Sequence, residues 1–151
     1  MYDARMFDIV AENNVIYCMM HMRGTPQTMA QQTDYQNLIF DIIEFFSEQL
    51  AKARNKGIKD IILDPGFGFA KTEEQNYQLL KELDVFKIFE LPILIGVSRK
   101  SMIYKPLKTT ASQALNGSTV LHTIALQKGA SIFRVHDVAE VKEVFELLKN
   151  L

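Results

Sequence analysis

Four short hydrophobic runs divide the sequence into repeating units. The runs are VIYCMM at 15–20, DIILD at 60–64, PILIGV at 92–97 and SIFRV at 131–135. Each has the length of one strand, and its apolar residues are nearly continuous rather than alternating with polar ones. That pattern is typical of strands buried on both faces of a parallel sheet. We therefore predict four parallel strands with both faces covered.

A helical pattern follows each predicted strand. After the first, hydrophobic residues recur at helical spacing from Ile39 to Ala53, and Gly57 is expected to end that helix. After the second, Thr72 and Gln75 have the spacing of a capping box, in which each side chain bonds to the other residue's backbone N–H. A further helix is therefore predicted to begin at this point.

Similar signals follow the last two strands. Thr110 and Gln113 repeat the capping-box spacing, and Gly129 is expected to end the helix that they open. Asp137 and Glu140 begin a final segment whose hydrophobic residues also recur at helical spacing. Each of the four strands is thus predicted to lead into a helix.

The order of elements predicts an α/β fold. A short helix over roughly residues 3–13 precedes four strand–helix units, which indicates a parallel sheet with right-handed crossovers. An open sheet and part of a (β/α)8 barrel both fit. A whole barrel takes about 250 residues, whereas this chain has 151 and opens on a helix with no strand before it. We expect one domain over residues 1–151, built as half of a barrel, whose open sheet edges favour pairing with another chain or a second copy.

Composition narrows the classes of partner. The net charge is -1 and no long run of like charge occurs, so nucleic acid is not expected to be a partner. No apolar stretch approaches the roughly 20 residues of a membrane helix, and no signal peptide is recognised, so no membrane association is expected. The single cysteine, Cys18, excludes a disulfide framework and fits the reduced cytoplasm.

Polar and glycine residues follow each strand. They form the segments HMRGTP at 21–26, DPGFGFAKT at 64–72, SRKS at 98–101 and RVHD at 134–137. The carboxyl ends of parallel strands meet at one edge of the sheet, and α/β proteins place their sites there. The sequence therefore predicts a functional site at this edge.

Two of these segments carry candidates for binding a planar polar ligand. Asp64 could accept two parallel hydrogen bonds from an amino-pyrimidine edge, although a turn-forming or capping aspartate is an equally good interpretation. Lys100 could donate to an oxyanion or a ring carbonyl, but spacing alone favours a solvated surface cation. Met20 is interpreted as core or pocket lining.

The last segment carries candidates for an anion. Arg134 and His136 are two residues apart, so on an extended chain they point to the same side, where both could donate to phosphate oxygens. The competing interpretation is an arginine–aspartate surface pair beside a core histidine. His21 is more often structural in such a context. No group of residues has the spacing of a zinc site, so no metal ligands are assigned.

Five segments together resemble the dihydropteroate synthase family. They are MMHMRGTPQTM at 19–29, ILDPGFGFAKTEEQN at 62–76, ILIGVSRKSMI at 93–103, NGSTVLHTIA at 116–125 and GASIFRVHDV at 129–138. They occur in the family's order and span nearly the whole chain. The resemblance implies the C-terminal half of a (β/α)8 barrel. It also implies the condensation of 6-hydroxymethyl-7,8-dihydropterin pyrophosphate with p-aminobenzoate, which gives dihydropteroate and pyrophosphate in folate biosynthesis.

The same resemblance assigns roles in binding the pterin. Asp64 would bind the amino-pyrimidine edge and Lys100 would donate to the ring. Met20 and Phe69 would line the slot, with Phe69 also near p-aminobenzoate. Ser101 would approach the p-aminobenzoate carboxylate.

Catalytic roles would belong to Lys100, Arg134 and His136, with Arg134 stacking along the pterin and reaching the pyrophosphate and His136 holding the anion. The resemblance also implies a Mg²⁺ cofactor, whose protein ligand belongs to the first four strands of the family's barrel, and a dimer formed by helices over 111–128 and 137–149. Two alternatives stay open: a pterin-dependent methyltransferase-like domain, which SRK and RVHD suit less well, and a non-catalytic half-barrel that binds pterin or pairs with a partner chain.

Overall fold

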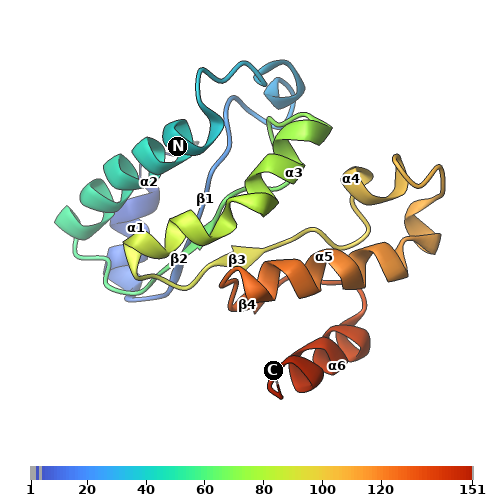
Figure 1. Cartoon of the computed structure of the whole chain (residues 1–151). Helices are drawn as coiled ribbons and strands as arrows, with labels where there is room; N and C mark the ends of the chain where they lie inside the picture. Colours follow the sequence, from blue (N-terminus) through green and yellow to red (C-terminus); the bar gives the residue numbers. More distant parts are fainter. Residues whose placement is uncertain (1–2, 4, 151) are drawn as a thin grey trace.

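The computed structural model describes residue 3 and residues 5–150. Its elements alternate between strands and helices along the chain (Figure 1). The strands are β1 (Tyr17–Met20), β2 (Ile61–Asp64), β3 (Leu94–Ile95) and β4 (Ile132–Phe133). The α-helices are α1 (Met6–Asn13), α2 (Leu38–Asn55), α3 (Glu73–Lys81), α4 (Ser101–Tyr104), α5 (Leu115–Gln127) and α6 (Val138–Leu148). Three short 3-10 helices are η1 (Met29–Gln31), η2 (Leu83–Phe89) and η3 (Ala111–Gln113).

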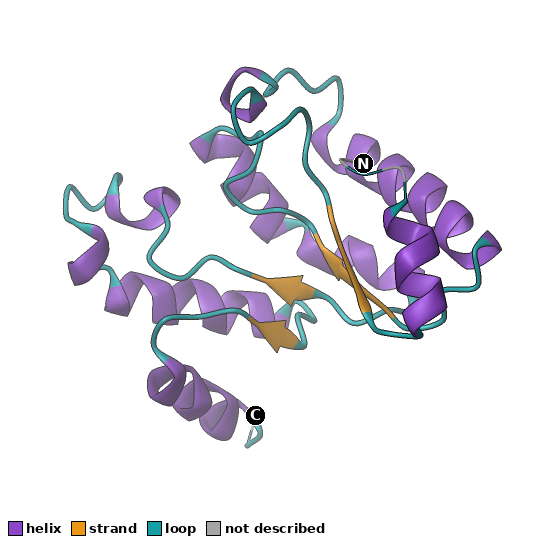
Figure 2. Cartoon of the chain, turned by 180° about the vertical axis from the view of Figure 1, so that it is seen from behind, coloured by secondary structure: helices purple, strands orange, loops and turns teal. Residues whose placement is uncertain are grey.

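The four strands follow one another in sequence order across a parallel sheet. β1 pairs with β2, and β3 pairs with β4. A parallel bridge between Leu63 and Ile93 joins the two pairs. In Figure 1 α3 and α5 lie in front of the strands, and Figure 2, from behind, brings the strands to the foreground. The predicted class, α/β with parallel strand–helix units, is confirmed.

The prediction that the strands are buried on both faces is wrong. Met19, Leu63 and Ile95 are fully buried against the helices. Adjacent residues whose side chains point to the opposite face are more accessible to solvent: Cys18 is exposed and Ile62 is only half-buried. The difference arises because helices cover one side of this sheet, whereas none of the described strands packs against its inner side.

The long helix α2 forms where the hydrophobic periodicity predicts it. The Asn37 side chain caps its first turn by accepting a hydrogen bond from the backbone N–H of Phe40 at 3.1 Å. Ile42 and Phe46 are fully buried at helical spacing, so one face of α2 packs on the outer side of the sheet. Gly57 follows the end of the helix, as predicted.

Of the three predicted helix starts, one has the expected capping interactions. Thr72 and Gln75 form a complete capping box at the start of α3. Thr110 and Gln113 do not, because the hydroxyl of Thr110 donates to the Gln113 side chain at 3.2 Å and α5 begins only at Leu115. Asp137 does precede α6, but its carboxylate binds an arginine instead of the helix N-terminus. Among the described residues, no helix has the length and apolarity to cross a membrane.

Candidate active site

Asp64 ends β2 and begins a tight loop. Its Oδ1 accepts a hydrogen bond of 2.8 Å from the backbone N–H of Gly66. Gly66 has a φ of +75°, and a Cβ atom there would lie 2.0 Å from the carbonyl oxygen of His21, so only glycine fits. The turn-forming interpretation of Asp64 is therefore correct for Oδ1. Among the described residues, this is the only hydrogen bond to the carboxylate, which leaves Oδ2 available to a ligand.

The Asp64 carboxylate is buried, with 6% of the residue exposed. Burial raises its pKa, whereas the Gly66 N–H and then the charges of Lys100, Arg134 and Lys71 lower it. The surrounding cations therefore favour the ionised form that burial disfavours. A carboxylate in this setting gains from a ligand that donates hydrogen bonds.

The side chain of Lys71 binds backbone carbonyl groups of the loop that follows Asp64. Its Nζ lies 3.0 Å from the carbonyl oxygen of Gly66, 3.2 Å from that of Phe69 and 3.0 Å from Nδ1 of His21. Burial lowers the pKa of Lys71 to about 7. Burial, followed by the charges of Lys71 and Arg23, lowers the pKa of His21 to about 3. His21 is thus a neutral structural residue, and Lys71 is a residue of the site that sequence reasoning missed.

Lys100 lies between β3 and α4, and its side chain contacts the loop that follows Asp64. Its Nζ donates to the carbonyl oxygen of Phe67 and stands 4.6 Å from the centre of the Phe69 ring. Burial first, and then the charge of Arg134, lower its pKa to about 8. The interpretation of Lys100 as a solvated surface cation is therefore wrong.

Arg134 extends across the end of β3. A Cβ atom at Gly96 would lie 2.8 Å from Nη2 of Arg134, so the guanidinium group occupies the space that the missing side chain leaves. Arg134 itself is exposed. The competing prediction, an ion pair between Arg134 and Asp137, is wrong because Asp137 pairs with Arg99.

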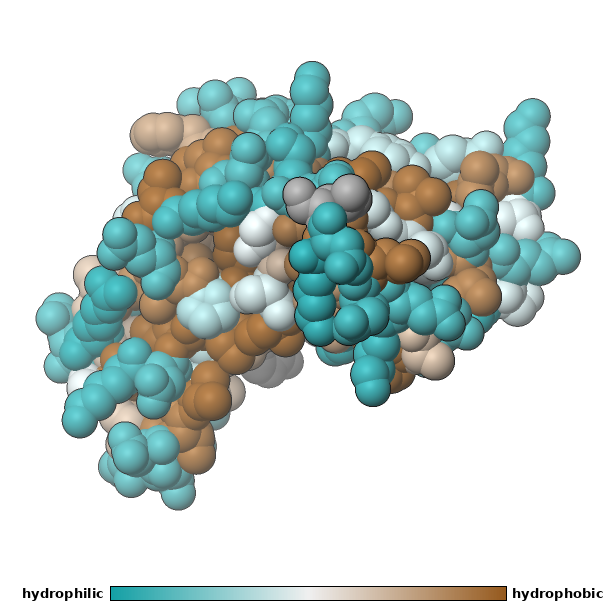
Figure 3. Space-filling view, turned by 60° about the horizontal axis from the view of Figure 1, so that its bottom comes forward, coloured by the Kyte–Doolittle hydropathy of each residue, from teal (hydrophilic) through white to brown (hydrophobic). Residues whose placement is uncertain are grey.

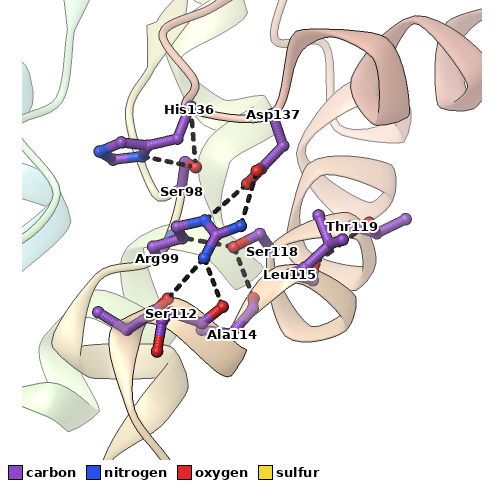
Figure 4. Close-up of polar contacts among 10 residues, drawn as sticks. Ser98, Arg99, Ser112, Ala114, Leu115, Ser118, Thr119, His136 and Asp137 are labelled. Atoms are coloured by element: carbon purple, nitrogen blue, oxygen red, sulfur yellow. Dashed lines mark hydrogen bonds and ion pairs between the residues drawn. The ribbon is translucent and has the colours of Figure 1, made fainter.

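His136 lies beside Ser98, and Figure 4 shows the two side chains facing each other. The distance from Ser98 Oγ to Nδ1 of His136 is 3.0 Å, and the His136 backbone N–H donates to the same oxygen at 3.2 Å. Ser98 is buried with 4% exposed, whereas His136 is exposed and hence not a core histidine.

The remaining predicted residues lie at the same edge. Met20 pairs in register with Asp64, and both it and Phe69 are half-buried. Ser101 is the first residue of α4 and directly follows Lys100. A cavity of about 560 Å³ borders Met20 and Cys18, but it runs beside β1 and does not include Asp64 or the cations. Of the predicted site residues, Met20 alone lines this cavity.

The described residues do not fit a magnesium site. Within residue 3 and residues 5–150, no group of three or more His, Cys, Asp or Glu side chains could hold a metal ion. The buried carboxylate of the site, Asp64, is surrounded by the positive charges of Lys71, Lys100 and Arg134. A divalent cation would add to this positive charge without gaining a second carboxylate ligand.

Comparisons with known proteins point in one direction. A model of the pterin binding enzyme family matches residues 1–136. The dihydropteroate synthase of Escherichia coli K12 is 41% identical over 144 residues, which cover 94% of this chain and 51% of that protein. The dihydropteroate synthase of Synechocystis sp. PCC 6803 is 40% identical and is covered to 53%. The chain thus spans about half the length of the curated relatives it matches.

Solved structures give the same result. The dihydropteroate synthase of Yersinia pestis with a sulfonamide drug has a TM-score of 0.95 and 38% identity, over 99% of this chain and 55% of that one. The enzyme of Thermus thermophilus with 4-aminobenzoate has a TM-score of 0.95 and 34% identity, over 99% and 62%. These matches confirm the predicted fold, half of a (β/α)8 barrel. The chain therefore belongs to the pterin binding enzyme family.

Proposed function

We propose that residues 1–151 act as one pterin-binding domain and supply half of a dihydropteroate synthase site. The site would condense 6-hydroxymethyl-7,8-dihydropterin pyrophosphate with p-aminobenzoate in folate biosynthesis. The observation that carries this proposal is the buried carboxylate of Asp64, whose Oδ2 is available while Lys100 and Arg134 lie beside it. That arrangement suits a ligand with a flat hydrogen-bond-donating edge and an anionic tail.

The ring end of the ligand is assigned to four residues. Asp64 accepts from the amino-pyrimidine edge, and Lys100 donates to the ring. Lys100 is partly desolvated, and its Nζ lies 4.6 Å from the centre of the Phe69 ring. Met20, opposite Asp64 in the strand register, lines the other side of the slot with Phe69.

The leaving-group end is assigned to Arg134 and His136. In the proposed reaction the amine nitrogen of p-aminobenzoate bonds to the pterin methylene carbon. The bond from that carbon to the pyrophosphate oxygen breaks, its electron pair stays on the pyrophosphate, and the amine releases a proton. Both side chains are exposed and can donate to the oxygens on which charge grows. Ser101 is assigned to the p-aminobenzoate carboxylate.

Further strands are proposed to complete the barrel, because the inner side of the sheet is open. Cys18 is exposed on β1, and Val15 and Ile16 just before it are 51% and 64% exposed. Figure 3 likewise shows hydrophobic residues in exposed patches on the face turned forward from the bottom of Figure 1. The cavity of about 560 Å³ beside β1 lies where a neighbouring strand would pack. The magnesium ligand, if the reaction uses that ion, is proposed to belong to those strands.

A dimer through α5 and α6 and a cytoplasmic location complete the proposal. Val120 on α5 and Leu147 on α6 are 49% and 71% exposed, and a groove of about 460 Å³ runs between the two helices. Burial of such apolar surface is the usual source of stability in dimers. The single cysteine supports the reduced compartment.

Product formation tests the proposed activity. The chain would be co-expressed with the N-terminal half of the Escherichia coli relative, and dihydropteroate would be measured from the two substrates. We expect turnover that falls by about a hundredfold or more when Arg134 or His136 is replaced by Ala. An exposed control, Lys59→Met, should leave the rate unchanged. A folded, co-purified assembly that forms no dihydropteroate would contradict the proposal.

A further inference from the structure

Ser98 is a buried hydroxyl with a specific set of partners. The residue is 4% exposed, so its hydroxyl proton has little access to water. Its oxygen accepts the His136 backbone N–H at 3.2 Å. The acceptor that the described residues offer to its proton is Nδ1 of His136, at 3.0 Å. Buried hydroxyl protons are almost always donated to an acceptor, so Nδ1 must present its lone pair.

We propose that Ser98 is a positioning residue that fixes His136 in the Nε2–H tautomer, with Nε2–H directed outward to donate to an anionic oxygen of the ligand. A neutral imidazole with an unprotonated Nδ1 carries its proton on Nε2. The hydroxyl of Ser98 binds both the backbone and the ring of His136, which closes a small ring of contacts and limits rotation of the imidazole. The identity of the anion rests on the proposed function, whereas the tautomer does not.

An adjacent ion pair links the segments after β3 and β4 and keeps Ser98 close to His136. Arg99, the next residue after Ser98, donates from Nε and Nη2 to the two oxygens of Asp137 at 2.8 and 2.7 Å (Figure 4). Asp137 directly follows His136, so the ion pair links the neighbours of the two residues that bond to each other. Both members are largely shielded, with side-chain exposures of 23% and 16%.

Further contacts hold Arg99 in an unusual backbone conformation. Its φ is +54°, a left-handed conformation that is unfavourable for a residue with a side chain. Three further contacts hold it there. Nη1 donates to the carbonyl oxygens of Ala111 and Ser112, and the backbone N–H donates to the hydroxyl of Ser118 at 2.9 Å. The Ser98–His136 contact is therefore anchored to η3, α5 and the start of α6.

Nitrogen NMR of the three histidines tests the tautomer without any ligand. The sequence has three histidines, and His21 and His122 serve as internal references because neither forms a described hydrogen bond with Ser98. In alkaline buffer, where imidazoles are neutral, we expect the Nδ1 resonance of His136 to be that of an unprotonated nitrogen. Ser98→Ala should shift it toward a mixture of tautomers, whereas Ser98→Thr, which keeps the hydroxyl, and the control Ser112→Ala should not.

Two results would overturn the proposal. One is a proton on Nδ1 of His136 in the wild-type chain. The other is an unchanged His136 spectrum in Ser98→Ala while the His21 and His122 signals show an intact fold. If Ser98→Ala does not fold, Ser98→Cys provides the same test, because it fills the same space but replaces the hydroxyl with a weak donor and should also release the ring into a mixture. An unchanged ring in that variant would then be decisive against the proposal.

Titration with inorganic pyrophosphate tests the consequence for binding. We expect Ser98→Ala to weaken pyrophosphate roughly three- to tenfold, the contribution of about one hydrogen bond. In a His136→Ala background the same change should have no further effect, since Ser98 acts through His136. Equal losses in both backgrounds would show an ordinary structural role and overturn the proposal. Failure of the wild type to bind pyrophosphate, with the tautomer as expected, would instead reject the anion site of the proposed function.

Discussion

The guanidinium group of Arg134 occupies the space above Gly96, where a Cβ atom would stand 2.8 Å from Nη2. Gly96 directly follows β3 and Arg134 directly follows β4, so the contact crosses between adjacent strands. The absence of a side chain at position 96 leaves room for the guanidinium group beside the end of β3. Its charge thereby stays close to Asp64 and Lys100.

Gly96→Ala is expected to displace Arg134 and weaken pyrophosphate binding by about tenfold, the value of one charge-assisted hydrogen bond. Stability should change little, because the added methyl group meets the end of a flexible side chain. Calorimetric titration and urea unfolding measure the two quantities.

Arg134→Ala provides the matched control for this change. It should weaken pyrophosphate more than the bare pterin, and Gly96→Ala should add nothing in that background. Equal losses of pyrophosphate and pterin in Arg134→Ala would place Arg134 on the ring alone. Normal pyrophosphate affinity in Gly96→Ala would contradict the role of the Gly96 contact.

Thr72→Ala is expected to destabilise the fold by about 1 kcal/mol, because it removes the side chain that caps α3. Thr110→Ala is a matched comparison with the same sequence spacing but no cap in the structure. Its effect should stay within about 0.5 kcal/mol, as for ordinary surface changes. Urea unfolding of both variants separates them, and equal losses of stability would show that the two threonines do not differ as described.

The sequence was a good guide to the elements and a poorer one to their surroundings. Hydrophobic periodicity located α2, and short continuous apolar runs located the four strands, because both patterns reflect burial between sheet and helices. The spacing at Thr110 could not reveal that a 3-10 helix intervenes before Leu115. Asp137 looked like a helix cap because nothing local indicates that Arg99, 38 residues away, takes its carboxylate. The prediction that both faces of the sheet are buried failed for the same reason, because burial depends on what packs against each face and the strand sequence alone does not show that.

The sequence likewise predicts most of the candidate site residues but not Lys71. Asp64, Lys100, Arg134 and His136 stand at strand ends, so the topology of a parallel sheet brings them to one edge. Lys71 was missed because a lysine after a glycine-rich loop has no signature that separates a buried cation from a surface one. Its position seven residues after Asp64 in an otherwise apolar loop is the one signal that could have suggested it.

Lys71→Met is expected to remove a pH dependence of stability. Burial lowers the pKa of Lys71 from 10.5 to about 7 in the folded chain. Between these values the unfolded chain keeps a proton that the folded chain has released, so the free energy of unfolding of the wild type rises with pH. One proton gives a slope of at most about 1.4 kcal/mol per pH unit.

Urea unfolding of wild-type and Lys71→Met proteins across this pH window measures the difference in slope. Lys100 also titrates in this window and is present in both proteins, so the comparison isolates the change made at Lys71 and its charge interaction with Lys100. Lys59→Met, at an exposed position, should keep the wild-type slope. Parallel slopes for wild type and Lys71→Met would show that Lys71 is charged throughout.

Cys18 is expected to report on completion of the barrel. Its thiol is exposed on β1, although burial of part of the side chain and then the charge of Asp64 raise its pKa. In mildly alkaline buffer, a maleimide should therefore label Cys18 when the N-terminal half of a relative is absent. Addition of the N-terminal half of a relative should protect the thiol, and undiminished labelling of a co-purified complex would argue against closure over β1.

The most direct test of the central claim is a calorimetric titration with dihydropterin pyrophosphate, compared between the wild type and Asp64→Asn. The variant keeps an oxygen for the Gly66 N–H but replaces the other acceptor with a donor, so we expect at least about a hundredfold loss of affinity. Asp60→Asn, at an exposed aspartate before the same strand, is the control and should bind as the wild type does. Saturable binding that disappears only in Asp64→Asn would support Asp64 as the pterin anchor. Equal affinity in wild type and Asp64→Asn would contradict it.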